Sequence, residues 1–218
     1  MVNNLKKTGW IKGYSGNKFH IFNPKVSDVN IYDIAHSLAR LCRFNGTVDC
    51  DIYSVAQHSV IVSHIDKHLF PLEKLLHDGT ESVVGDVVRP LKIWLDDFPV
   101  YEEKVDRVIA RAFKLSRTKK CLAEVKRADN IALVTEARDL LTSTDALSDY
   151  CPDVQPLPWK IKPWGVKKSE REFLKRFFEL TSFWKHSMAF SEFKIENFKW
   201  KSIPLKNIKF CENIRRRT

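Results

Sequence analysis

The sequence has few of the features that mark secreted, membrane-spanning or disulfide-rich proteins. No window comes near the roughly twenty consecutive apolar residues of a membrane-spanning helix, and the start from Met1 to Lys7 lacks the apolar stretch of a secretory signal. The five cysteines are odd in number, scattered, and never spaced as a Cys-x-x-Cys pair. Such pairs underlie disulfide frameworks and zinc ribbons. We therefore expect reduced thiols in a soluble, cytoplasmic protein without a membrane partner.

Internal repeats and low-complexity stretches are also absent, and the length predicts one main domain. A chain of 218 residues with 44% apolar content is long enough to bury one good core. The net charge of +10 is uneven: from Trp159 to Thr218 there are sixteen Lys or Arg against six Asp or Glu, whereas the first 158 residues balance at 21 against 21. A basic tail can attract nucleic acid, another anionic partner or solvent, and charge alone does not choose among them.

The hydrophobic spacing predicts an all-α fold, a helical bundle with a short irregular or β start. Helical patterns are expected from Asn30 to near Gly46, from Tyr53 to about Leu69, and over residues 72–80, 101–115, 119–142 and 169–184. Four prolines between Cys151 and Trp164 predict an extended strap along the helical body. The predicted divisions are an N-terminal segment (1–30), a helical core (31–150), a proline-rich strap with a packing helix (151–184) and a basic aromatic tail (185–218).

Two histidines and two aspartates form a candidate divalent-metal site, because three predicted helices supply them at positions that can converge. They are His58, His77, Asp78 and Asp129. A catalytic first-row metal needs three or four nitrogen and oxygen ligands, with positions left open for water and substrate. This set suits manganese, iron, cobalt, nickel or zinc. The alternative for each residue alone is a packed core histidine or a paired surface carboxylate.

The motifs around these residues, in their order, resemble the HD-domain phosphohydrolases. They are Asp-Ile-Ala-His-Ser-Leu-Ala-Arg-Leu-Cys-Arg-Phe-Asn-Gly (33–46), Tyr-Ser-Val-Ala-Gln-His-Ser (53–59), His-Asp-Gly-Thr-Glu (77–81) and Gly-Asp-Val-Val-Arg-Pro-Leu-Lys (85–92). The chain is most similar to the branch that holds bacterial 5′-deoxynucleotidases and phage deoxynucleotide phosphohydrolases. The resemblance is strong over about residues 31–141 and looser over 157–180.

The resemblance implies roles for further residues beside the four metal ligands. Glu81 would handle the attacking water, although Gly79 and Thr80 stand here where family members commonly carry Ala-Ser. Arg43 would grip the substrate phosphate and Phe44 would pack on the base. A guanidinium offers a bidentate fork to phosphate oxygens, and an aromatic face tolerates different bases. Ordinary core packing is the alternative for Phe44.

Two other residues are expected near the substrate, and one in support. Asp86 matches a catalytic-site aspartate close to the sugar and the water, with a turn-capping role after Gly85 as the alternative. Lys92 is a candidate phosphate partner, or else a solvated surface lysine. His36 is expected to be structural or to support a ligand.

The function implied is a divalent-metal-dependent phosphohydrolase that cleaves the 5′-phosphate or triphosphate from 2′-deoxynucleotides. Water would attack the α-phosphorus, with Glu81, Arg43 and Asp86 as the catalytic groups. Phage relatives suggest a preference for deoxyadenosine nucleotides. The alternatives are a monophosphate-specific 5′-deoxynucleotidase and a nucleic-acid-binding scaffold that acts through the basic tail. The resemblance also implies a homo-oligomer, and a host cytoplasmic location if the chain is phage-encoded.

Overall fold

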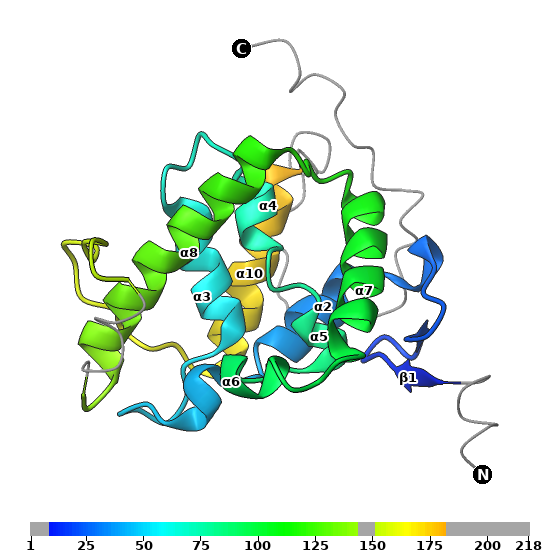
Figure 1. Ribbon diagram of the computed structural model, residues 1–218, viewed down its shortest axis with the longest axis horizontal. Coiled ribbons are helices and arrows are strands. Elements are labelled where there is room, and N and C mark those ends of the chain that lie inside the picture. Colours follow the sequence, from blue (N-terminus) through cyan, green and yellow to red (C-terminus); the bar gives the residue numbers. More distant parts are fainter. Residues whose placement is uncertain (1–8, 144–150, 182–218) are drawn as a thin grey trace, which may run out of the picture.

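The computed structural model describes residues 9–143 and 151–181, and this part of the chain is mostly helical (Figure 1). The prediction of an all-α fold with a short β start is confirmed at this level. The helices are α2 (Ile31–Leu38), α3 (Val55–His64), α4 (Pro71–Leu75), α5 (Glu81–Val84), α6 (Arg89–Lys92), α7 (Phe98–Phe113), α8 (Lys119–Leu140) and α10 (Val166–Leu180), with 3₁₀ turns η1 (Val26–Asp28) and η2 (Arg43–Gly46). The predicted basic tail lies outside the described residues.

A small antiparallel hairpin precedes the helices, where the sequence predicts an irregular or β start. Strands β1 (Trp10–Lys12) and β2 (Lys18–His20) pair so that Ile11 lies opposite Phe19. The hairpin turn is tied to α2 because Asp33 accepts hydrogen bonds from the Ser15 backbone N–H at 2.6 Å and from its hydroxyl at 2.8 Å. The hairpin therefore covers one side of α2.

Helix α2 begins where predicted but ends earlier. The Asn30 side chain accepts a hydrogen bond from the Tyr32 backbone N–H at 2.9 Å and caps the helix. The predicted end near Gly46 is wrong, since α2 stops at Leu38 and the chain turns into η2. The Arg43 backbone N–H donates to the Tyr53 carbonyl at 2.9 Å, so a distant pairing replaces the next helical turns. This turn carries Arg43 toward α3.

Helix α3 also ends before its predicted limit. It runs only to His64, because Ile65 adopts an extended conformation where the pattern predicts helix as far as Leu69. The freed Ile65 carbonyl accepts a hydrogen bond at 2.8 Å from the ammonium group of Lys74, whose side chain is buried on α4. A contact from the next helix thus stabilises this helix end.

The helix predicted over residues 72–80 is interrupted at the candidate site. Helix α4 ends at Leu75, and a tight turn separates it from α5, which begins at Glu81. A Cβ atom at Gly79 would lie 3.0 Å from the Leu76 carbonyl oxygen, so the turn favours glycine at this position. The pair His77 and Asp78 therefore lies on a turn between helices and not within one.

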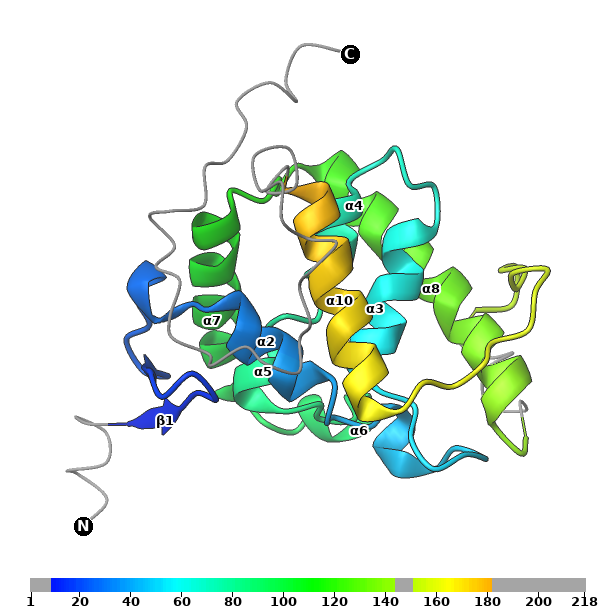
Figure 2. The ribbon, with the colours of Figure 1, turned by 180° about the vertical axis from the view of Figure 1, so that it is seen from behind.

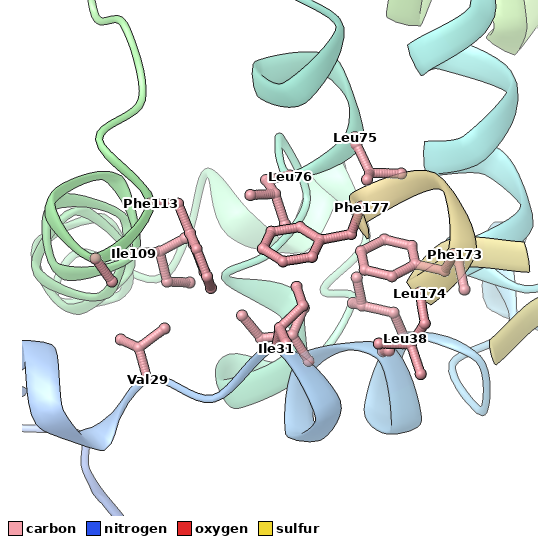
Figure 3. Packing of buried hydrophobic residues seen from close by; sticks show 14 of the residues in the cluster. Val29, Ile31, Leu38, Leu75, Leu76, Ile109, Phe113, Phe173, Leu174 and Phe177 are labelled. Atoms are coloured by element: carbon pink, nitrogen blue, oxygen red, sulfur yellow. The ribbon is translucent and has the colours of Figure 1, made fainter. Parts of the chain in front are cut away.

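Helix α3 is central to the helical body. It packs against α4, α8 and α10, and Figure 2 shows α10 lying between α3 and α2. The larger buried cluster brings Phe113 of α7 together with Phe173 and Phe177 of α10 (Figure 3). A smaller cluster joins α3 to α8 through residues such as Val62 and Ala132. The predicted helices over 101–115, 119–142 and 169–184 correspond to α7, α8 and α10 over their described residues.

The proline-rich segment before α10 has no regular secondary structure and lies on the helical body, as predicted. Gln57 of α3 donates its amide N–H to the Lys162 carbonyl at 2.9 Å and accepts from the Trp164 backbone N–H at 2.7 Å. Arg138 of α8 donates to the carbonyls of Leu157 and Trp159 at 2.7 Å and 2.8 Å. Side chains from two helices therefore satisfy backbone groups of the strap.

The Phe177→Ala substitution should destabilise the fold strongly. Its side chain is fully buried and its ring contacts those of Phe113 and Phe178 edge to face, with centroids 5.2 Å and 5.6 Å away. Loss of such a ring leaves a cavity and typically costs about 3–5 kcal/mol. Urea unfolding followed by circular dichroism measures this free energy. Trp94→Ala is the matched control, since Trp94 is 83% exposed and should change stability little; equal effects would contradict the packing described.

Candidate metal centre

Two histidine side chains from different elements face each other at the candidate site. His58 projects from the middle of α3 and is fully buried, while His77 lies on the turn after α4. Their Nε2 atoms are 3.2 Å apart. The Asp78 Oδ2 atom lies 3.5 Å from the Nε2 of His58 and 3.2 Å from that of His77. Three potential ligand atoms thus converge on one point.

Helix α8 adds a fourth potential ligand to this point. The Asp129 Oδ1 atom lies 3.3 Å from His58 Nε2 and 3.8 Å from His77 Nε2. Ligand atoms of His58, His77 and Asp129 all lie within 4.8 Å of one another, a grouping that could hold a metal ion. Asp78 faces the same two nitrogens although it falls outside that threefold grouping. The structure therefore brings all four predicted ligands together.

The other ring nitrogen of each histidine is already occupied, which suits a metal site. His77 Nδ1 lies 2.8 Å from the Lys74 carbonyl oxygen, and His58 Nδ1 lies 2.5 Å from Glu136 Oε1. A carbonyl can only accept, so Nδ1 of His77 carries the hydrogen and its Nε2 can offer a lone pair in the neutral ring. Metal-binding histidines commonly have this arrangement. The donor set of imidazole nitrogens and carboxylate oxygens fits a divalent first-row ion.

Charge compensation within the cluster shifts the pKa values of its members. Burial opposes the His77 imidazolium, but the carboxylates of Asp78 and Asp129 outweigh it and raise the pKa of His77 to about 9. Burial and Arg43 likewise oppose charge on His58, yet carboxylate neighbours leave its pKa raised. Burial opposes the Asp129 carboxylate, but hydrogen bonds from both histidines hold its pKa well below the usual range. Without a cation, His77 therefore favours its protonated form at neutral pH.

Glu81 lies beside the cluster as a buried acid. Its side chain is on the first residue of α5, and its Oε2 atom is buried without a hydrogen-bond partner in the described part of the chain. Burial, followed by the negative charges of Asp78 and Asp86, raises the pKa of Glu81 to about 9. A buried carboxyl with an unused oxygen is the kind of group that exchanges a proton with a ligand.

Arg43 reaches the cluster from η2 and brings Phe44 with it. The Arg43 side chain is largely buried, and its Nη1 atom lies 3.5 Å from Asp78 Oδ2. Burial opposes the guanidinium charge, but nearby carboxylates raise its pKa and keep it charged. The guanidinium carbon lies 5.5 Å from the centre of the half-buried Phe44 ring. Phe44 has φ of 53° in the left-handed region, where a bulky side chain is strained.

Asp86 and Lys92 are the two other residues predicted to bind the substrate. Burial is the main cause of the raised pKa of Asp86. The nearby charge of Arg43 lowers this pKa, and that of Asp78 raises it further. Lys92 is paired with Glu102 of α7 at 2.8 Å, so its ammonium group is already compensated by a protein carboxylate.

His36 contacts residues other than those of the metal cluster. Its Nδ1 lies 3.2 Å from Glu170 Oε1 on α10, and its ring stacks on Tyr14 with centroids 3.6 Å apart. These contacts join α2 to α10 and to the hairpin.

Two residues of the site escape the sequence-based prediction. Glu136 is fully buried on α8 and contacts His58, and the Tyr53 hydroxyl donates to Glu136 Oε1 at 2.7 Å. The available signal is spacing: Glu136 follows Asp129 by seven residues, which is two helical turns, so both lie on one face of α8. A glutamate on that face, level with buried alanines such as Ala132, indicates a paired internal charge.

The fold and the cluster define a mostly helical protein with a site that could hold a divalent metal ion. No protein-family model matches the chain. The chain is 42% identical over 131 residues to "Uncharacterized protein YfdR" of Escherichia coli (strain K12), covering 60% of this chain and 72% of that protein. An uncharacterized protein of Rhodobacter capsulatus is 32% identical over 156 residues, covering 66% of this chain and 79% of its own length. The chain belongs to the family of these two proteins.

None of the described helices combines the length and the apolar character that a membrane span requires.

Metal affinity should fall as the pH is lowered. An incoming ion needs the free Nε2 lone pairs, and below about pH 9 it must displace the proton that His77 holds. We expect affinity for cobalt to weaken by about tenfold per pH unit for each displaced proton. Calorimetric titration from about pH 6 to about pH 8, in buffers of different ionisation heat, counts the protons released.

Two variants separate the cluster from nonspecific binding in this titration. His77→Ala should lose most of the affinity, whereas His64→Ala, at the exposed end of α3, should retain it. Affinity that does not change with pH, or equal behaviour of the two variants, would contradict the assignment.

Proposed function

We propose that the protein is an HD-domain phosphohydrolase that uses a divalent metal ion to cleave 2′-deoxynucleotides at the 5′-phosphate. The observation that supports this most is the convergence of His58, His77, Asp78 and Asp129 beside a buried glutamate and a buried arginine. The ordered motifs that resemble this family supply the same residues. Neither relative's name assigns an activity, so the site itself carries the proposal.

The two histidines and two aspartates would hold the metal ion. Such an ion supplies Lewis acidity, which acidifies the attacking water and neutralises charge on the phosphate. Manganese, cobalt, zinc, nickel and iron are all compatible with this donor set. The protein keeps these ligands oriented through the Nδ1 contacts of both imidazoles.

Glu81 would take the proton from the attacking water. The oxygen of that water forms a bond to the α-phosphorus while the bond from phosphorus to the 5′-oxygen breaks, and the leaving deoxynucleoside oxygen gains a proton. Burial and two carboxylate neighbours favour the protonated form of Glu81 in the absence of a cation. A metal ion held by the neighbouring Asp78 would bring a positive charge close to Glu81. That charge would favour the ionised form of Glu81, which is the form that accepts a proton.

Arg43 and Phe44 would bind the substrate on the side of η2. The guanidinium of Arg43 remains charged in its largely buried position and can offer paired N–H groups to phosphate oxygens. The half-buried ring of Phe44 can stack on the base. Asp86, within the electrostatic reach of Arg43, can accept a hydrogen bond from the sugar. Lys92 would contribute to phosphate binding only if it left Glu102.

The same cleavage releases inorganic phosphate from a monophosphate and triphosphate from a triphosphate. An assay of deoxynucleoside mono-, di- and triphosphates, with and without manganese or cobalt, therefore tests the proposal and separates these substrates. Metal-dependent release of deoxynucleoside supports it. Absence of turnover with every substrate and metal would overturn it and favour a scaffold that acts through the basic tail.

The Glu81→Ala variant should lose turnover while it keeps the metal ion. Removal of a proton-transfer group typically lowers kcat by about 10²- to 10⁴-fold, and Glu81 is not among the four proposed ligands. Steady-state kinetics and a cobalt titration on the same preparation measure both properties. Glu103→Ala is the matched control, since Glu103 is exposed on α7 and pairs with Arg107. Full activity of Glu81→Ala would refute the role proposed for this residue.

A further inference from the structure

One buried carboxylate on α8, that of Glu136, lies between the proposed metal ligands and the proposed phosphate-binding arginine. Glu136 has no exposed surface. Its Oε1 atom lies 2.5 Å from His58 Nδ1 and accepts the Tyr53 hydroxyl at 2.7 Å. Its Oε2 atom lies 3.2 Å from Arg43 Nε. The two oxygens of one side chain therefore point to a proposed metal ligand and to the proposed phosphate-binding arginine.

The contact with His58 selects the nitrogen that can bind metal. A carboxylate beside Nδ1 favours the hydrogen on that nitrogen and leaves Nε2 to face His77 and the aspartates. A neutral amide at the same position could present its NH₂ group to Nδ1. The imidazole would then carry its hydrogen on Nε2, where the metal lone pair is needed. The charge and orientation of Glu136 thus matter to metal binding.

The contact with Arg43 is an ion pair by distance, since Arg43 Nε and Glu136 Oε2 form no hydrogen bond within the described residues. The attraction between the two buried charges favours a guanidinium that lies with its Nε side toward Glu136. With Nε beside Glu136 Oε2, the Nη1 atom lies 3.5 Å from Asp78 Oδ2, at the edge of the metal cluster. Without this pairing, a buried guanidinium would be free to turn toward the other carboxylates around it.

We propose that Glu136 is a positioning residue that orients His58 for the metal ion and Arg43 for the phosphate at the same time. The phosphate part of this proposal rests on the proposed function, whereas the metal part rests on the cluster alone. Glu136 touches neither the substrate nor the ion, and it acts through the two side chains that do. Its backbone on α8 also carries Asp129 two turns earlier, so one helix supplies a ligand and the support for another.

The contrast with another acidic residue of α8 shows that this arrangement is not a general feature of the helix. Glu124 lies nearer the start of α8 and pairs with Arg127 of its own helix at 3.1 Å. It has no contact with the cluster in the described residues. Glu124→Gln is therefore a matched control for Glu136→Gln, because it makes the same chemical change on the same helix.

The test compares these variants by binding, without a need for turnover. Cobalt titration, followed by calorimetry and by visible absorption, reports metal affinity and ligand geometry. Titration of the cobalt-saturated protein with inorganic phosphate reports the phosphate affinity, which is expected to depend on Arg43. We expect Glu136→Gln to weaken cobalt binding by about 10- to 100-fold and to alter the cobalt spectrum. Phosphate binding should also weaken, by about tenfold, and Glu124→Gln should match the wild-type protein in every titration.

A double-mutant cycle with Arg43→Ala separates the two effects. If Glu136 acts on phosphate through Arg43, its substitution should weaken phosphate binding little more once Arg43 is gone. The loss of cobalt affinity should persist on the Arg43→Ala background. A full additional loss of phosphate affinity, or wild-type cobalt affinity and spectrum in Glu136→Gln, would overturn the proposal.

Should Glu136→Gln fail to fold, Glu136→Asp decides the matter in the same titrations. It keeps the charge but shortens the side chain by one methylene, which withdraws the carboxylate from both partners. Positioning predicts weaker binding of both cobalt and phosphate, whereas charge compensation alone predicts no change and would overturn the proposal. Failure of the proposed function is a separate result, because it would be absence of hydrolysis by the wild-type protein.

Discussion

The arrangement of the helices depends on one fully buried histidine. His58 lies at the middle of α3, where its ring is removed from solvent, and burial of an imidazole without partners is costly. Its Nδ1 partner comes from Glu136 of α8, and the atoms near its Nε2 come from the turn after α4 and from Asp129 of α8. Because both ring nitrogens of His58 need partners, α3, α8 and the turn after α4 must pack together around this ring.

The sequence predicts the long helices well and their ends less well. Periodic apolar residues are enough to place α7, α8 and α10, since each buries one continuous face. The ends of α2 and α3 depend on contacts with the segments that follow each helix. The Arg43 backbone pairs with Tyr53 in one case, and the Lys74 ammonium bonds to the Ile65 carbonyl in the other. No local pattern encodes such contacts.

The same distinction applies to the candidate site. Its four proposed ligands could be named from residue type, order and resemblance, and the structure brings their ligand atoms to one place. Resemblance also indicates Lys92 as a phosphate partner, but the structure pairs it with Glu102. The sequence does not predict a role for Glu136, because glutamate on a long helix usually faces solvent and the packing of α3 on α8 makes this one internal. The residues that orient the ligands depend on packing, so they are harder to predict from the sequence than the ligands themselves.

Protein cations and imidazoles together compensate the carboxylate charges of the cluster. Arg43 lies 3.5 Å from a carboxylate oxygen of Asp78, and Lys126 pairs with Asp129 at 2.8 Å. The carboxylates in turn raise the pKa values of both imidazoles, that of His77 to about 9, and hydrogen bonds from the rings hold the pKa of Asp129 well below its usual range. A divalent ion would displace the proton that His77 holds and would place a positive charge beside both carboxylates. The Nδ1 contacts of both rings leave the Nε2 atoms free of this support, so the same contacts can orient the ligands in either state.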